Sequence, residues 1–348
     1  MNAPSVHHPP EALRKARAHL LAWYEEHRRP LPWRNTTDPY AIWVSELMCQ
    51  QTRVDTVIPY FQRWMSALPT IESLAQAPIE RVLLLWQGLG YYRRARYLHA
   101  GAQKVMTDFD GQLPRTEKEL KSLPGIGPYT AGAIASIAFQ QATPAIDGNV
   151  LRVLSRVTME EESISRAPAQ RRIRAFADRL VQGPRPGDLN QALMEIGATQ
   201  CTPTTPRCST CPLASICKAA AHHCAEQYPI KDAKKAPRIE YAFAWLATRP
   251  KDQAIFLCQR NDDELLGGLW EMPLFSHAPN PKDWTNEGEI RHLFSHIDLR
   301  LELWTCHHEH TLPALPQRYQ QSKWVEPKDL RNYPQSTLMR KLLALSTP

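Results

Sequence analysis

Four cysteines in one short stretch limit the fold of this 348-residue chain more than any other feature. Four thiolates can hold a zinc ion or a [4Fe-4S] cluster, and the stretch that carries them must wrap around it. Zinc sites usually pair their cysteines as two C-x2-C units. The spacing here, C-x6-C-x2-C-x5-C, contains only one such unit, which favours iron–sulfur over zinc. Cys224 lies outside the pattern and is expected to be free. The four candidate ligands are Cys201, Cys208, Cys211 and Cys217.

The pattern of polar and apolar residues divides the chain into two domains. From residue 11 to 224, helical patterns repeat at short intervals between prolines and glycines, and strand-like alternation is scarce. Residues 225–238 are rich in lysine, alanine and proline, which indicates a linker. From 239 to 345, residues alternate or run apolar over strand-like lengths. The sequence predicts a mostly α N-terminal domain and an α+β C-terminal domain, each large enough for its own core.

The charge balance is moderately basic, with 42 lysine and arginine residues against 35 aspartate and glutamate residues. This balance is compatible with nucleic acid as a partner, but a solvated basic surface explains it equally well. The N-terminus lacks the apolar core of a signal peptide, and no stretch approaches ~20 apolar residues. We therefore expect a cytoplasmic protein without a membrane partner, and we expect it to be a monomer.

The stretch LPGIGPYTAGAIASIAF, residues 123–139, has the pattern of a turn followed by a helix. Gly125 and Gly127 allow positive φ and a close approach of the backbone to another group. Pro128 suits the first position of a helix, where its missing N–H costs nothing. A bare turn before a helix N-terminus presents N–H groups to an anion. The sequence predicts an anion site at this turn, with Tyr129 at its rim.

A single carboxylate lies among apolar residues in YAIWVSELMCQQT, residues 40–52, which has a helical pattern. Glu46 shares a helix face with Ile42 and Cys49. Such a carboxylate lies either at an exposed edge or in a desolvated environment that raises its pKa. From this helix alone, the exposed position is the more usual one.

A second carboxylate precedes a helical run in AIDGNVLRVLSR, residues 145–156. Asp147 or Asn149 is placed to cap a helix that begins near Val150. A helix N-terminus stabilises an ionised carboxylate, so a capping and a catalytic role can coincide. A protonated Glu46 beside an ionised Asp147 would be the division of labour that cleavage of a glycosidic bond requires.

Together these motifs resemble one family. The glycine turn, the AIDGNV segment and the cysteine spacing are similar to those of the helix-hairpin-helix DNA glycosylases with an iron–sulfur cluster, and further motifs look like the adenine DNA glycosylases among them. The resemblance covers about residues 12–217, with the helix-hairpin-helix at about 118–139, and continues into a C-terminal domain of Nudix type. The further motifs are LPWR (31–34), WVSELMCQQTRVDTVIPYF (43–61), GLGYYRRARYLH (88–99), NQALMEIGA (190–198), GGLWEMP (267–273) and HLFSHIDL (292–299).

The resemblance implies a monofunctional DNA glycosylase of base excision repair. Its substrate would be double-stranded DNA in which adenine is mispaired with 8-oxoguanine or guanine. Glu46 would protonate N7 of the adenine, and Asp147, oriented by Asn149, would stabilise the oxocarbenium-like sugar. Lyase-type relatives carry a Schiff-base lysine where this chain has Tyr129, whose phenol would instead help to hold Asp147. The alternative for Tyr129 is simple packing at a helix start.

The resemblance also implies contacts with DNA. Gly125 and Gly127 would bind a phosphate, which positions the protein without reading sequence. Glu195 would lie near the adenine edge, with a helix-surface glutamate as the alternative. For the loop at 294–296, the alternative is an ordinary strand end. The remaining matches are Gln51 and Tyr91 as wedge residues, Leu31, Trp33 and Arg34 at the pocket mouth, and Phe294, Ser295 and His296 in the loop that distinguishes 8-oxoguanine from guanine.

Departures from the family pattern and rival functions complete the hypothesis. Cys49 stands beside the candidate acid where leucine is more usual. The C-terminal domain lacks the pyrophosphatase signature G-x5-E-x7-R-E-x2-E-E, so we expect a reader module rather than a hydrolase. A glycosylase/lyase is disfavoured by Tyr129, and a DNA-binding module without turnover by the presence of both carboxylates. Since hydrolysis needs no electron, the cluster is expected to brace a loop whose neighbours Arg207 and Lys218 meet phosphate.

Overall fold

The computed structural model describes residues 8–233, 235–306 and 314–346, which group into two compact units. One unit comprises the described residues of Met1–Glu72 and Ala100–Ala233, and the other those of Ser73–His99 and Lys234–Pro348. Two helices, α4 and α6, contribute residues to both units. Across the described ranges, no helix is both long enough and apolar enough to cross a membrane.

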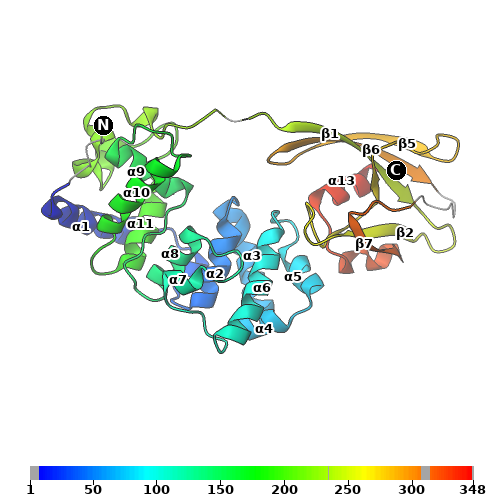
Figure 1. The fold of residues 1–348 in the computed structure, drawn as a ribbon, viewed down its shortest axis with the longest axis horizontal. Helices are drawn as coiled ribbons and strands as arrows, with labels where there is room; N and C mark the ends of the chain where they lie inside the picture. The colour runs from blue at the N-terminus through cyan, green and yellow to red at the C-terminus, as the bar shows by residue number, and fades with distance from the viewer. Residues whose placement is uncertain (1–7, 234, 307–313, 347–348) are drawn as a thin grey trace. The chain divides into compact units, whose positions relative to one another are not determined.

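The N-terminal part of the chain is helical, as the sequence predicts (Figure 1). Local chemistry determines several helix starts: Asp38 caps α2 and Asp147 caps α9 by accepting hydrogen bonds from backbone N–H groups of the first turn. The helices are α1 (Pro10–His27), α2 (Pro39–Cys49), α3 (Val54–Ala67), α4 (Ile71–Gln76), α5 (Ile79–Trp86), α6 (Arg93–Asp108), α7 (Glu117–Leu120), α8 (Pro128–Ile137), α9 (Gly148–Thr158), α10 (Ala167–Leu180), α11 (Pro186–Thr199) and α12 (Lys218–Ala221), with short 3-10 turns η1 (Pro32–Arg34), η2 (Cys208–Thr210), η3 (Ala214–Ile216) and η4 (Ala225–Gln227).

A helical core holds the first unit together. Leu20 on α1, Val153 on α9, Ile173 on α10 and Leu193 on α11 belong to one buried cluster, and each is almost inaccessible to water. Fully burying side chains of this size contributes roughly 1.5–3 kcal/mol each. The core therefore fixes α9 and α11, which carry the residues described below.

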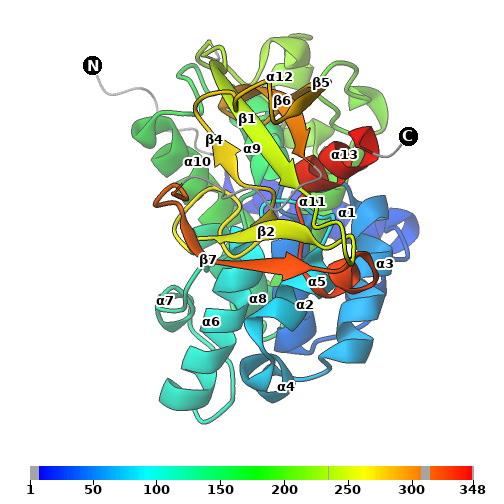
Figure 2. The same cartoon turned by 90° about the vertical axis from the view of Figure 1, so that its right-hand side faces the viewer.

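The second unit contains two β-sheets. The larger has the strand order β4-β1-β6-β5, with β1 and β6 parallel and the other pairs antiparallel. The smaller has the order β3-β2-β7 and is antiparallel; Figure 2 shows β2 and β7 side by side. The elements are β1 (Arg238–Ala247), β2 (Ile255–Arg260), β3 (Trp270–Glu271), β4 (Leu274–Phe275), β5 (Thr285–Leu293), β6 (Ile297–Cys306), β7 (Tyr319–Val325), η5 (Pro327–Asn332) and α13 (Thr337–Leu345).

The larger sheet buries one face against α13. Leu301 and Leu303 on β6 form a core with Met339 and Leu342 on α13. Phe294, Ser295 and His296 connect β5 to β6, so this sheet anchors both ends of the expected reader loop. One mixed sheet, one antiparallel sheet and a covering helix confirm the predicted α+β class, and the helical first unit confirms the mostly α class.

Candidate active site and cysteine cluster

Glu46 lies on α2 and is buried. Only 8% of the residue is exposed, so the exposed position that its helix alone favoured is wrong. The Tyr129 hydroxyl donates a hydrogen bond to Glu46 Oε2. Burial raises the pKa of Glu46 to about 7; the Tyr129 hydrogen bond opposes this rise and the nearby Asp147 charge adds to it. Near neutral pH, a carboxyl with this pKa can carry a proton and donate it.

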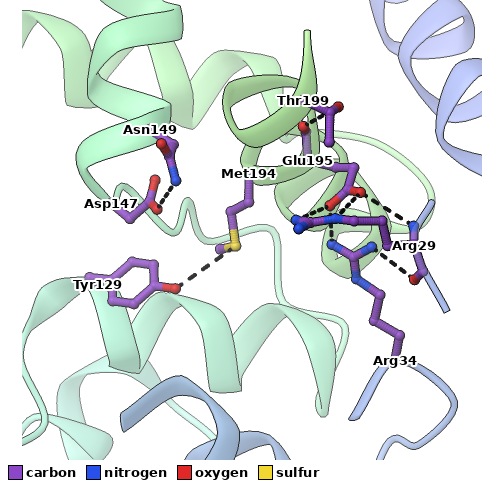
Figure 3. A network of polar contacts seen from close by, with 8 residues as sticks. All are labelled: Arg29, Arg34, Tyr129, Asp147, Asn149, Met194, Glu195 and Thr199. Carbon is purple, nitrogen blue, oxygen red and sulfur yellow. Dashed lines mark hydrogen bonds and ion pairs between the residues drawn. The ribbon is translucent and has the colours of Figure 1, made fainter. Parts of the chain in front are cut away.

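Tyr129 lies in the first turn of α8 and contacts Glu46 rather than Asp147. Its hydroxyl bonds to Glu46. It also lies 3.9 Å from Met194 Sδ, as Figure 3 shows for these two side chains. The resemblance implied a bond to Asp147, but that carboxylate is engaged by its own helix. Burial and then the Glu46 charge raise the pKa of Tyr129, which keeps the phenol protonated as a donor.

Asp147 caps α9, as the sequence predicts. Its Oδ1 accepts a hydrogen bond from Val150 N at 2.7 Å, and its Oδ2 accepts one from Asn149 Nδ2 at 3.1 Å. Arg152 Nη2 in turn donates to Asn149 Oδ1 at 3.0 Å, which fixes the orientation of the amide. Burial raises the pKa of Asp147, although the bonds from Val150 and Asn149 act to lower it. The capping bonds thus favour the ionised form against a desolvation cost that the sequence did not reveal.

A small cavity of about 40 Å³ opens beside Glu46. Its lining is half apolar and half polar or charged, so it offers both packing surfaces and hydrogen-bonding groups to a small ligand. Trp33 and Arg34, predicted at a pocket mouth, line it, and Leu31 next to them is 6% exposed. Gln191 and Met194 also line it; sequence reasoning missed both, although they belong to the quoted motif NQALMEIGA. The lining residues are Trp33, Arg34, Ile42, Ser45, Glu46, Ile137, Gln191 and Met194.

Glu195 is fully buried and forms ion pairs with two arginines (Figure 3). Arg29 Nε and Nη2 contact its two oxygens at 2.7 and 2.9 Å, and Arg34 Nη2 contacts Oε2 at 2.5 Å. Burial acts to raise the pKa of Glu195, but these bonds hold it below its ordinary value. The helix-surface alternative for Glu195 is therefore wrong. Sequence reasoning missed Arg29, although the basic run RRPLPWR was a signal for it.

The glycine turn before α8 is open to solvent. Gly125 has φ +74°, a conformation that favours glycine, whereas Gly127 has φ −86°, which any residue adopts. A Cβ added to Gly127 would meet nothing within 4 Å, so open space lies in front of the helix N-terminus. This space is compatible with an anion at the turn, and the anion site stays a prediction. Gln51, expected to be a wedge residue, is exposed with φ +57°.

In the second unit, Tyr91 and Ser295 are neighbours. Their hydroxyl oxygens lie 2.9 Å apart. Tyr91 is 48% exposed and has φ +48°, and the Arg94 guanidinium carbon lies 5.5 Å from its ring centroid. His296 is exposed beside Ser295, and Phe294 is partly buried. Tyr91, one of the two predicted wedge residues, thus lies beside Ser295 of the predicted reader loop.

The four cysteines of the C-x6-C-x2-C-x5-C pattern line one common cavity. In the part of the chain that the structure describes, no three His, Cys, Asp or Glu side chains converge as ligands of a single metal ion. Four thiols around one cavity are a donor set that either a zinc ion or an iron–sulfur cluster can use.

Two arginines on α9 converge on the first cysteine. Arg156 is 1% exposed and donates to the sulfur of Cys201 at 3.2 Å and to the carbonyl oxygen of Thr202 at 2.7 Å. Arg152 Nε donates to the carbonyl oxygen of Cys201 at 2.9 Å. Both side chains contact Cys201, so a thiolate there would have a buried positive charge beside it. Of the expected phosphate contacts, Arg207 and Lys218 are both exposed.

Comparisons with known proteins agree with this geometry. Residues 44–179 match the family described as HhH-GPD superfamily base excision DNA repair protein, and residues 244–345 match the NUDIX domain. The chain is 37% identical over 399 residues to adenine DNA glycosylase from Rattus norvegicus, covering 94% of this chain and 77% of the relative. It is 35% identical over 364 residues to that of Schizosaccharomyces pombe, covering 81% and 79%.

A solved structure resembles the helical part of the chain. The structure of a thermostable thymine-DNA glycosylase superposes with a TM-score of 0.56 at 26% identity, and the match covers 61% of this chain and 98% of that one. The first matched family range contains Glu46, Tyr129 and Asp147, and the second contains Ser295.

Proposed function

The chain belongs to the adenine DNA glycosylase family, and we propose that it is a monofunctional enzyme that hydrolyses the N-glycosidic bond of adenine mispaired with 8-oxoguanine or guanine in double-stranded DNA. One observation carries the proposal: a buried carboxyl with a pKa of about 7, Glu46, lies close enough to the helix-capping Asp147 for their charges to interact. Such an enzyme works where DNA is kept, which in a bacterial cell is the cytoplasm.

The proposed reaction divides the work between the two carboxyls. The adenine leaves the base stack and enters the pocket beside Glu46. Glu46 in its acid form gives a proton to N7, which makes the base a better leaving group. As the bond breaks, positive charge develops on the sugar, and the ionised Asp147 stabilises it. Glu46, now ionised, can accept the proton of the attacking water.

Tyr129 supports hydrolysis without strand cleavage. A lyase step needs an amine that attacks the sugar carbon and forms a Schiff base. A phenol cannot form that intermediate, and here it donates to Glu46 instead. We therefore expect an intact strand that carries an abasic site.

Glu195 and its two arginines would define the polar side of the adenine site. Their buried ion pairs hold the carboxylate oxygens and guanidinium donors in fixed directions. Rearranging them to fit another base would leave a buried charge unpaired, which is costly. This rigidity supports selectivity at the base edge.

We propose that Cys201, Cys208, Cys211 and Cys217 hold a [4Fe-4S] cluster. Their thiolate donor set and shared cavity support this assignment. The bound cluster would cross-link the loop between α11 and α12. Arg207 and Lys218, exposed beside that loop, would contact DNA phosphate, and no step of the hydrolysis passes through the cluster.

Single-turnover cleavage of a labelled duplex with adenine opposite 8-oxoguanine tests the function. We expect strand breaks only after alkali, because the enzyme leaves an abasic site. Breaks without alkali that borohydride traps on the protein would mean that an amine acts as a lyase. A lack of adenine release by protein that holds iron and sulfide would contradict the glycosylase assignment.

Changing both Ser295 and His296 to alanine is expected to reduce the preference for 8-oxoguanine over guanine by about 10-fold or more, since lost hydrogen bonds to a base edge cost ~1–3 kcal/mol. The measurement is the ratio of single-turnover rates on the two mispairs. The rate should fall mainly on the mispair with 8-oxoguanine, because Ser295 and His296 would contact the base opposite the adenine and not the adenine itself.

The chain offers an identical tripeptide as a matched control. Phe275, Ser276 and His277 follow the same leucine, but Phe275 is buried and the His277 ring packs against Trp245 at 5.8 Å. Changing Ser276 and His277 to alanine should leave the preference unchanged. Equal losses from both double variants would contradict the reader-loop assignment.

A further inference from the structure

The loop that delivers Asp147 has no regular structure of its own. Residues 140–147 are irregular, between the end of α8 and the start of α9. Irregular segments rely on hydrogen bonds from elsewhere to satisfy their backbone and to hold one conformation. The capping bonds of Asp147 fix its direction relative to α9 but do not hold the preceding residues.

One buried side chain on α11 holds this loop. Asn190 is 0% exposed, and its Oδ1 accepts a hydrogen bond from Ala145 N at 2.9 Å. Its Nδ2 donates to the carbonyl oxygen of Thr143 at 2.8 Å and to Ser136 Oγ on α8 at 2.9 Å. The amide therefore uses three hydrogen-bonding positions, two on the loop and one on α8.

Two glycines allow the loop to lie close to both helices. A Cβ on Gly132 of α8 would lie 2.3 Å from the carbonyl oxygen of Pro144, and one on Gly197 of α11 would lie 2.6 Å from Asn149 Cβ. Neither distance is possible between real atoms without movement. The segment 144–149 is therefore pressed against α8 at its start and against α11 at its end, with Asn190 between them.

We propose that Asn190 is a positioning residue for excision: it fixes the loop 143–145 and thereby places the Asp147 carboxylate. The inference rests on the role proposed for Asp147. Asn190 is not assigned any contact with the adenine or the sugar; it acts through two backbone groups. A displacement of ~1 Å in a group that must face a developing charge can cost about 10²-fold in rate.

The test compares the rate of adenine excision with the affinity for DNA. Asn190→Ala is expected to lower the single-turnover rate about 10- to 100-fold, counted per folded molecule. The dissociation constant for a duplex with a non-cleavable adenine analogue should stay within about twofold, because no contact with DNA is lost. Asn190→Asp keeps an acceptor for Ala145 N but loses the donors, so an intermediate loss is expected; this variant serves if alanine prevents folding.

A double variant distinguishes positioning from general support. In an Asp147→Asn background, Asn190→Ala should have little further effect on the residual rate, because the group that it positions has lost its charge. Ser136→Ala is the matched control, since it removes the third bond of the same amide and leaves both loop bonds. The proposal would be overturned if Ser136→Ala lowered the rate as much as Asn190→Ala does. It would also be overturned if Asn190→Ala lowered the rate as much in the Asp147→Asn background as in the wild type. If Asp147→Asn alone keeps full activity, the proposed role of Asp147 fails instead.

Discussion

Changing Glu46 to glutamine is expected to slow adenine excision by about 10²- to 10⁴-fold, the usual contribution of a positioned proton donor. The pKa of about 7 gives the sign of the pH dependence: the acid form donates, so the wild-type rate should fall as pH rises through about 7. The variant has nothing to titrate at this position, and its residual rate should be flat there. Single-turnover rates between pH 5 and 9 measure both effects.

The Glu46→Gln variant should be more stable than the wild type at alkaline pH, although it is less active. The pKa of Glu46 is 4.5 in the unfolded chain and about 7 in the folded protein. Between these two pH values the carboxyl ionises more readily in the unfolded chain, so it lowers the free energy of unfolding progressively as pH rises. Removing it should raise the free energy of unfolding at pH 8 by about 2–3 kcal/mol, less any change in the bond from Tyr129. Glu160→Gln is the matched control: Glu160 is also buried but pairs with Arg172, so its change should lower stability and leave the rate unaltered. A Glu46→Gln variant that is less stable at pH 8, or fully active, would contradict the assignment.

Asp147→Asn is the second substitution with a large expected effect, a loss of about 10²- to 10³-fold in the single-turnover rate. The reason is electrostatic, since the neutral amide cannot balance the positive charge that develops on the sugar. The fold should survive because asparagine caps a helix as well as aspartate does. Affinity for a non-cleavable duplex should change little.

Asp38 offers a control with the same local chemistry. It caps α2 through bonds to Tyr40 N and Ala41 N, as Asp147 caps α9. Asp38→Asn should therefore have a similarly small effect on stability and should leave excision within about twofold. If both variants lose activity to the same extent, the loss at Asp147 reflects capping and not charge.

Local features of the active site could be predicted from the sequence. The cap at Asp147, the proline start of α8 and the two fold classes depend on interactions within a few residues, and the structure agrees with each. Their boundaries are shorter than predicted: α8 ends at Ile137 rather than 139, and α2 at Cys49 rather than 52. Propensity does not define where a helix frays.

Long-range contacts could not be predicted in this way. Glu46 and Glu195 each lie on a helix whose own pattern allows an exposed glutamate, and only the packing of other elements buries them. The two arginines on Glu195 are separated from it by more than 160 positions, which no local pattern reveals. Tyr129 likewise bonds to a partner 83 residues away. The resemblance named Glu195 as functional but did not identify these partners.

The close packing of the segment 144–149 against α8 and α11 also has a consequence for how such an enzyme can evolve. Gly132 and Gly197 leave no room for a side chain: added Cβ atoms would lie 2.3 and 2.6 Å from atoms of the segment 144–149. Single substitutions there must move a backbone, so selection would remove them one at a time even though these residues have no chemistry to lose. The apolar residues that line the cavity beside Glu46, such as Ile42 and Ile137, are under no such constraint at a glycine, whereas Glu46 and Arg34 are held by their proposed roles. Divergence in substrate preference should therefore accumulate around a catalytic loop that is inherited almost unchanged.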